Sequence, residues 1–194
     1  MVAANFEQLR AKLVSVNDLG PRGAYLWAVR QATRLDGTPT AINRVSVPEG
    51  SWDAVVRVIL ASASGAPVAG DLTAATTSIE ARTRPSAIKV DVQPAVVAPY
   101  GRGVTIWVQR TNGLNLDAIQ AAANTAISSS FSTYPIGGIR KPSQPQGALY
   151  SDWVKGACRV HASIFDVDLS DESDMILASD AVPTWTGSVQ VRAA

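Results

Sequence analysis

Residues 103–138 read GVTIWVQRTNGLNLDAIQAAANTAISSSFSTYPIGG, and within this stretch the hydrophobic period changes. Aliphatic side chains occupy every second position from Val104 to Val108, which predicts a half-buried strand. From about Asn115 the apolar residues recur every three or four positions, which predicts a long helix. We expect residues 134–138 to end that helix, because proline and glycine break the helical pattern.

The same two periods alternate along the rest of the chain. Further helices are predicted for residues 5–16, 23–34, 71–81 and 149–158, with Asp71 as the N-cap of the third. Further strands are predicted for residues 42–47, 55–60, 88–92, 160–169 and 187–192. The first two of these strands are close in sequence, so we expect them to pair in an antiparallel manner.

This order of elements predicts an α+β fold. Adjacent strands are joined by short turns and are not separated by regular crossover helices, which favours small antiparallel sheets packed with helices. Pro85 is the best candidate for a boundary, so we expect two small modules, residues 1–85 and 86–194.

Composition excludes several classes of protein. Of the 194 residues, 46% are hydrophobic and 17% charged, enough apolar material for a packed core. The net charge of +1 gives no general attraction to nucleic acid or anionic lipid. Cys158 stands alone, so no intramolecular disulfide forms. Residues 1–10 lack a signal-peptide core, and no stretch matches a membrane span, so we expect a soluble chain that is neither exported nor inserted into a membrane.

Two groups of residues are candidates for a catalytic or a metal site. Cys158 and His161 are close in sequence, but a nucleophilic pair also needs a third group that orients the base, and the sequence shows none. We therefore expect both to pack or bond locally. The acidic segment, residues 166–174, suggests a calcium loop, but an EF-hand begun at Asp166 would need glycine sixth and glutamate twelfth. The sixth and twelfth positions are Asp171 and Leu177, so the segment does not match an EF-hand. It is either a solvated acidic loop or a looser cation site.

No other motif points to catalysis. Residues 101–103 lack the lysine and helix start of a phosphate-binding loop, and no cysteine–histidine group has metal-ligand spacing. The sequence therefore predicts no catalytic residues, no cofactor, no metal site and no small-molecule substrate, as expected of a protein that is not an enzyme.

Charge is unevenly distributed along the chain. One basic group lies between residues 82 and 141, and it consists of Arg82, Arg84, Lys89, Arg102, Arg110, Arg140 and Lys141. One acidic group lies between residues 160 and 191, and it consists of Asp166, Asp168, Asp171, Glu172, Asp174 and Asp180. Opposite charges on one chain suit head-to-tail contacts between subunits, although ordinary solvated faces would give the same pattern.

Trp107 is the most informative of the five tryptophans, which stand at positions 27, 52, 107, 153 and 185. It falls on the face of its strand opposite Val104 and Val108. That face is either an exposed interface with Trp107 as its anchor, or it is covered by a helix of the same chain.

Short strings spread over most of the chain occur in a distinctive succession. They are GPRGAYLWA at 20–28, NRVSV at 43–47, VVRV at 55–58, ASASG at 61–65, GDL at 70–72, GVTI at 103–106, YPIGG at 134–138 and VDL at 167–169. This succession resembles the C-terminal half of baseplate J-like proteins, the wedge family of contractile phage tail baseplates. Members of that family carry a substantial region before the Gly-Pro-x-x-Ala-Tyr helix, where this chain has about twenty residues.

The resemblance implies a structural protein of the virion, assembled in the host cytoplasm and located in the tail baseplate. Its partners would be other wedge and hub proteins and neighbouring copies of itself in a sixfold ring that triggers sheath contraction. Two alternatives stay open: another structural tail protein of the sheath or tail-terminator type, or a hydrolase or binding module with an unrecognised site.

Overall fold

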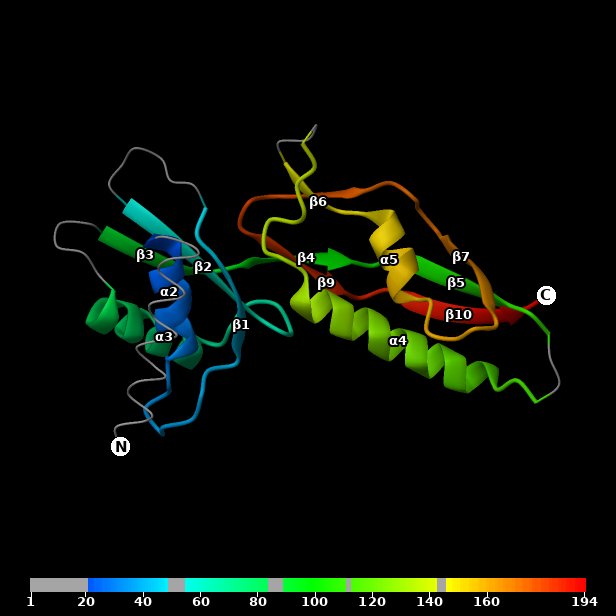
Figure 1. Ribbon diagram of the computed structural model, residues 1–194, viewed down its shortest axis with the longest axis horizontal. Coiled ribbons are helices and arrows are strands. Elements are labelled where there is room, and N and C mark those ends of the chain that lie inside the picture. Colours follow the sequence, from blue (N-terminus) through cyan, green and yellow to red (C-terminus); the bar gives the residue numbers. More distant parts are fainter. Residues whose placement is uncertain (1–20, 49–54, 84–88, 111–112, 143–145) are drawn as a thin grey trace. The chain divides into compact units, whose positions relative to one another are not determined.

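The computed structural model describes residues 21–48, 55–83, 89–110, 113–142 and 146–194, and it confirms the α+β class (Figure 1). The chain divides into two compact units, Met1–Ala95 and Val96–Ala194, and each has its own hydrophobic core. The helix predicted for residues 5–16, as well as Trp52 and Pro85, lies outside the described residues.

Over its described residues, unit 1 is a three-stranded sheet with two helices. Its elements are α2 (Pro21–Arg30), β1 (Ile42–Ser46), β2 (Val55–Ser62), α3 (Ala69–Arg82) and β3 (Lys89–Pro94). The strand order is β1-β2-β3. β1 and β2 are antiparallel, as predicted, whereas β3 joins β2 in parallel because α3 carries the chain back between them. The shared core is made of Tyr25, Ala28, Val29, Ala32, Val58, Leu60, Ala75 and Ile79.

The division between the units lies ten residues beyond the predicted boundary at Pro85. Val90 and Val92 of β3 stand opposite Val56 and Val58 of β2, so this strand completes the first sheet. The alternating pattern identified β3 as a strand but carried no information about its partner.

Unit 2 contains two helices and three small sheets. Its elements are β4 (Val96–Tyr100), β5 (Gly103–Val108), α4 (Leu116–Thr133), β6 (Gly147–Leu149), α5 (Ser151–Ala157), β7 (Ile164–Leu169), β8 (Met175–Leu177), β9 (Ala181–Trp185) and β10 (Ser188–Ala193). The sheets are β10-β5-β7, β4-β9 and β6-β8. The pairs β5–β10 and β4–β9 are parallel. The expectation of purely antiparallel sheets was therefore wrong in both units, since long connections bring strands together in the same direction.

The core of unit 2 lies between α4 and the sheet β10-β5-β7. α4 begins where the sequence predicted, because the Asn115 side chain accepts a hydrogen bond from the Ala118 N–H at 3.0 Å. Its apolar stripe, which includes Ile119, Ile127 and Phe131, packs in the same cluster as the buried residues of β5. Each fully buried aliphatic side chain contributes about 1.5–3 kcal/mol, so this layer is a major source of stability for the unit.

An aromatic cluster closes one end of this core. Ring centroids lie 4.5–6.0 Å apart among Tyr100, Phe131, Tyr134, Trp153 and Trp185. Trp153 and Trp185 thus pack against the core of unit 2, as Trp27 does against the core of unit 1. None of the helices in the described ranges is long and apolar enough to cross a membrane.

Candidate functional site

The YPIGG segment after α4 forms a tight backbone crossing, which we call the glycine crossing and define by Gly137, Gly138 and Gly147. Gly137 and Gly138 have φ values of 76° and 74°, in the left-handed region that favours glycine. A Cβ on Gly138 would lie 2.6 Å from the Ala148 nitrogen, and a Cβ on Gly147 would lie 1.7 Å from the Gly137 oxygen. Two backbone segments therefore touch where only glycine fits.

The crossing supports a short projection, which we call the arm (residues 139–142 and 146). Ile139 and Ala148 exchange backbone hydrogen bonds of 3.1 and 3.0 Å, and the Tyr134 hydroxyl donates to the Ala148 carbonyl at 2.7 Å. Burial raises the pKa of Tyr134 to about 12, so its hydroxyl remains a neutral donor. The Lys141 ammonium lies 3.7 Å from the centre of the Tyr150 ring. The base of the arm is thereby held in place.

Cys158 and His161 bond to separate partners. Cys158 is buried in the core, where its thiol donates to the Val154 carbonyl at 3.1 Å and burial raises its pKa to about 12. His161 is exposed, and its Nδ1 accepts the Ser163 N–H at 3.1 Å and lies 2.7 Å from the Ser163 hydroxyl. Each residue bonds locally, as expected from the sequence.

The carboxylates of the acidic segment bond to separate partners. Asp168 accepts from the Trp107 indole N–H at 2.7 Å, and Asp174 accepts from the Ser151 N–H at 3.1 Å. Asp166 accepts the N–H of the residue that follows it. Within the described ranges no three histidine, cysteine, aspartate or glutamate side chains converge as a metal site would require.

Two cations bind the acidic segment to the rest of unit 2. Arg102 lies 3.1 Å from the carboxylate of Asp171 and also donates to the Asp171 carbonyl at 2.8 Å. Lys155 lies 2.5 Å from Glu172. Hydrogen bonds from Ser173, more than the charge of Arg102, lower the pKa of Asp171. Part of the acidic charge is therefore balanced inside the unit, and the segment is structured, not a freely solvated loop.

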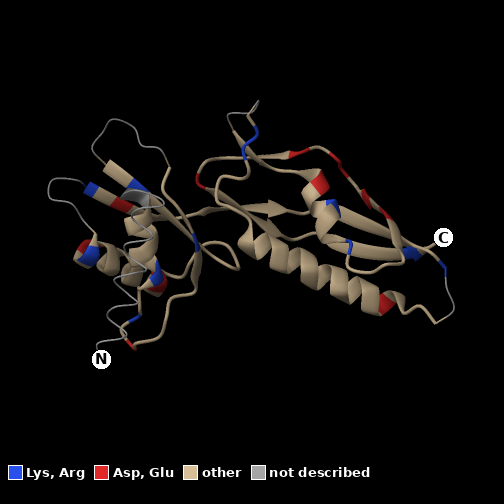
Figure 2. Cartoon of the chain, in the orientation of Figure 1, with Lys and Arg blue, Asp and Glu red and all other residues tan. Residues whose placement is uncertain are grey.

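The basic group of the sequence is divided between the two units (Figure 2). Arg82 and Lys89 belong to unit 1, and Arg102, Arg110, Arg140 and Lys141 belong to unit 2, while Arg84 lies outside the described residues. Acidic residues in Figure 2 follow the chain from β7 towards β8. A single basic surface that spans residues 82–141 is thus not established, and the basic residues next to each other in unit 2 are Arg140 and Lys141.

Trp107 lies on the face of the sheet β10-β5-β7 that points away from the buried valines of β5. Its cross-strand neighbours Asp166 and Arg192 are both exposed. The indole donates to Asp168, and the Arg192 guanidinium lies 5.9 Å from the ring centre. Trp107 is half-buried by these polar neighbours, and no described helix joins it in a core cluster. Its role as an interface anchor stays a prediction.

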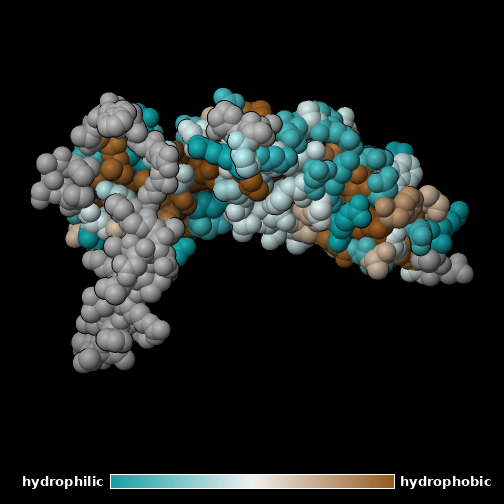
Figure 3. Space-filling model, turned by 45° about the horizontal axis from the view of Figure 1, so that its top comes forward, coloured by the Kyte–Doolittle hydropathy of each residue, from teal (hydrophilic) through white to brown (hydrophobic). Residues whose placement is uncertain are grey.

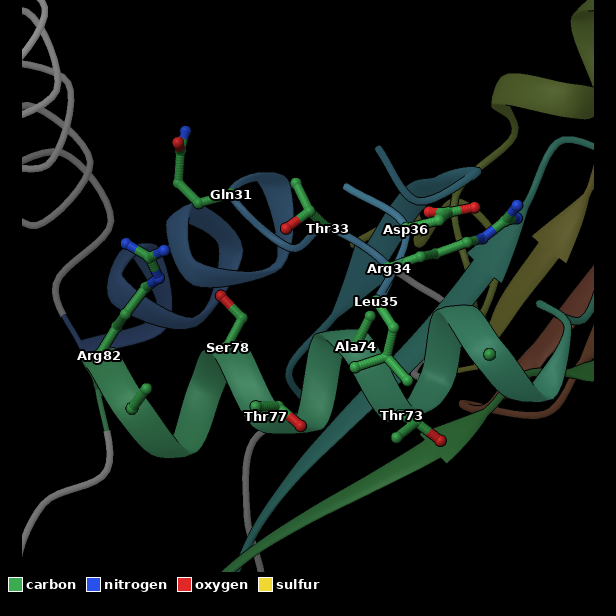
Figure 4. Close-up of a pocket in the computed structure, with 12 residues that line it drawn as sticks. Gln31, Thr33, Arg34, Leu35, Asp36, Thr73, Ala74, Thr77, Ser78 and Arg82 are labelled. Atoms are coloured by element: carbon green, nitrogen blue, oxygen red, sulfur yellow. The ribbon is translucent and has the colours of Figure 1, made fainter. Parts of the chain in front are cut away.

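Unit 1 contains a groove with a volume of about 590 Å³ along α3 (Figure 4). One wall is the segment that follows α2, and the other is the α3 face; its residues include Gly70, Thr73, Ala74, Thr77 and Ala81. The hydroxyl of Ser78 donates to the Ala28 carbonyl at 2.7 Å and that of Thr73 to the Ala69 carbonyl at 3.0 Å. These two lining hydroxyls bond to backbone, so neither is paired with a general base.

Asp71 anchors the segment beside this groove. Its carboxylate accepts from the Arg34 guanidinium at 2.6 Å and from the Ala41 N–H at 3.2 Å, and it is fully buried. The hydrogen bond from Arg34 holds the pKa of Asp71 below its usual value. The predicted N-cap role was wrong: α3 begins at Ala69, so Asp71 lies in its first turn and bonds across to the other wall.

The comparisons with known proteins do not assign a family. No protein-family model and no curated protein matches this sequence. The described geometry therefore carries the functional argument together with the sequence resemblance.

Proposed function

We propose that this chain is a structural subunit of the baseplate wedge of a contractile phage tail or a related injection machine. In this proposal it acts through contacts with neighbouring subunits and has no catalytic role. Its location would be the tail baseplate of the virion, and its partners would be wedge and hub proteins and other copies of the chain.

The glycine crossing is the observation that carries the proposal. The string YPIGG is the most specific part of the resemblance to baseplate J-like proteins. A Cβ on either of its glycines would collide with backbone, that of Ser179 for Gly137 and that of Gly147 and Ala148 for Gly138. The resemblance therefore rests on residues with a demanding structural task, and not on apolar alternation, which is common to many sheets.

The features of the two candidate sites also favour assembly over catalysis. Cys158 is buried and its thiol pKa is raised, which disfavours the reactive thiolate. The carboxylates of the acidic segment are engaged by separate donors. In a wedge protein, triggering would switch the packing of subunit interfaces from one state to another. Such interfaces need exposed anchor residues on rigid supports.

Labelled tail particles test this proposal. An affinity tag on the chain, expressed in the cell that produces it, should copurify with tail particles, and gold labels should lie at the baseplate end in electron micrographs. A tag that stays outside every particle, or that lies along the tail tube or sheath, would overturn the proposal. The second result would favour a sheath or tail-terminator role.

A further inference from the structure

The arm presents an exposed apolar pair. Ala148 of β6 stands opposite Ile176 of β8 and opposite Ile139 of the arm. Directly opposite residues in antiparallel pairs point to the same face, so the two isoleucines flank Ala148. The neighbouring residues Leu149 and Leu177 belong to the core, which places the two isoleucines on the opposite face, where Ala148 between them is itself fully buried. Ile139 is 40% exposed and Ile176 is 53% exposed.

Two cations complete this surface. Arg140 and Lys141 follow Ile139 directly, and both are exposed. Over the residues that the structure describes, neither has an ion-pair partner. We call Ile139, Arg140, Lys141 and Ile176 the arm surface. Figure 3 shows that apolar residues reach the molecular surface among hydrophilic ones.

β7 carries the complementary combination. Its register with β5 shifts so that Asp166 stands opposite Trp107 and Ile164 opposite Val108, which leaves Phe165 without a partner in the ladder. Such a bulge changes the direction in which a side chain points, and Phe165 is 49% exposed. Asp166 beside it is also exposed. We call Phe165 and Asp166 the β7 surface, an aromatic anchor with an adjoining carboxylate.

We propose that the β7 surface of one copy of this chain docks on the arm surface of another copy. Phe165 would pack against the exposed parts of Ile139 and Ile176, and the Asp166 carboxylate would bind Arg140 and the Lys141 ammonium, which lies over the Tyr150 ring. Aromatic residues are frequent anchors of interfaces, and complementary charge at the rim fixes their register.

We propose a head-to-tail contact, since it joins two different surfaces of unit 2. In that arrangement each copy keeps one free surface of each kind, and successive contacts can close into a ring. The ring as a biological setting rests on the proposed baseplate function, whereas the contact itself needs only this chain.

Complementary blocked variants test the contact on the purified full chain. The arm-blocked variant carries Arg140→Ser and Ile176→Ser, and the β7-blocked variant carries Phe165→Ser and Asp166→Ser. Sedimentation should show concentration-dependent association of the unchanged chain, weakened about tenfold or more in either variant. An equimolar mixture of the two variants should form a one-to-one dimer and nothing larger, because one intact surface of each kind is present.

Several outcomes would overturn the contact. They are an unchanged chain that stays monomeric at every concentration, a blocked variant that associates as before, and a mixture that stays monomeric. Circular dichroism melts of both variants check that they fold, which is expected because all four positions are exposed.

A disulfide experiment gives an independent test. A copy with Ile139→Cys mixed with a copy with Phe165→Cys should form a mixed disulfide under mild oxidation, while buried Cys158 does not react. The matched control is Val160→Cys, an equally exposed position outside both surfaces, which should not cross-link to the arm copy. Cross-linking of the control at the same yield would contradict the proposal.

The two proposals fail in different ways. If the tagged chain is absent from tail particles but the mixed disulfide forms, the contact stands and the baseplate function fails. If the chain lies in the baseplate but the blocked variants do not complement one another, the function stands and the contact fails.

Discussion

Two connecting segments, residues 31–41 of unit 1 and residues 134–142 and 146 of unit 2, are held against their units by different anchors. The first is tied by a side chain, because the buried carboxylate of Asp71 binds Arg34 and the Ala41 N–H. The second is tied by backbone, because the glycine crossing brings Gly137 and Gly138 against Gly147 and Ala148.

The two anchors therefore respond differently to pH and to substitution. A carboxylate anchor depends on ionisation, so it responds to pH, and an amide can replace part of its bonding. A backbone crossing depends on the absence of side chains, so it is indifferent to pH and intolerant of a single added carbon. The arm, which we assign to an interface, is held in place by the backbone crossing.

The largest expected effect comes from Gly147→Ala. The new Cβ would lie 1.7 Å from the Gly137 oxygen, so the crossing must open, and we expect unit 2 to lose roughly 4 kcal/mol or more. Urea unfolding followed by hydrogen exchange of peptides from each unit would show the loss in unit 2 alone. Gly156→Ala on α5 is the control, because its Cβ meets nothing within 4 Å and a helix gains up to about 1 kcal/mol from the change. Equal stabilities of the two variants would contradict the crossing.

Asp71→Asn should have the next largest effect. The amide keeps one acceptor but loses the charge that binds Arg34, and we expect unit 1 to lose about 2 kcal/mol. The same exchange measurement should show faster exchange in peptides from residues 31–41. Glu80→Gln, an exposed carboxyl of the same helix, is the control and should change much less. If the control destabilises unit 1 as much, burial of Asp71 is not the cause.

Acid should separate the two anchors without mutation. The pKa of Asp71 is lower in the folded chain than the unfolded value of about 4, so its contribution is present above pH 4 and is lost as the pH falls through the folded value. We expect residues 31–41 to lose protection below pH 4 before residues 134–142 and 146. Exchange rates corrected for intrinsic pH dependence measure this order. Simultaneous loss in both segments would show that the anchors do not differ in this way.

The smallest expected effect belongs to an exposed charge anchor. Glu172→Gln breaks the ion pair with Lys155, but the Glu172 side chain is 62% exposed, so water replaces the partner. We expect the melting temperature to change by less than about 2 °C. A larger change would mean that an exposed ion pair stabilises the fold as much as a buried one does. Burial would then not explain a large effect of Asp71→Asn.

Local signals in the sequence were sufficient for several elements. α4 follows from an apolar stripe and from Asn115 as its N-cap, all within one stretch of chain. The strands β1 and β2 likewise carry runs of β-branched residues, and their short separation predicted their antiparallel pairing. The break after α4 was also predicted, because Pro135 and two glycines disfavour a helix.

Other features depend on residues distant in sequence. The strands β4, β6, β8 and β9 were not predicted, because two of them contain proline and the other two have only three residues. Their pairing depends on partners elsewhere, such as Val96 opposite Ala181. Asp71 was predicted as the N-cap of a helix because only nearby residues were considered. Its hydrogen-bond partner, Arg34, lies 37 positions away in the sequence.

The candidate sites divide in the same way. The sequence predicted that Cys158 and His161 each pack or bond locally, and each has a local hydrogen-bond partner in the structure. It placed Trp107 opposite the valines of β5 but could not show whether a helix covers it. It also gave no sign that Phe165 stands in a bulge or that Ile139 and Ile176 share a face, because both depend on register.

The amino-acid sequence by itself determined the α+β class, the described helices, the longer strands, and the end of α4 before Pro135 and two glycines. These properties depend on residues a few positions apart, whose spacing and backbone preferences are visible in the chain. Only the tertiary structure decided the direction of β3 and β10, the partners of the acidic side chains, and the surfaces on the arm and β7. Those depend on contacts between distant segments, whose register a linear pattern does not specify.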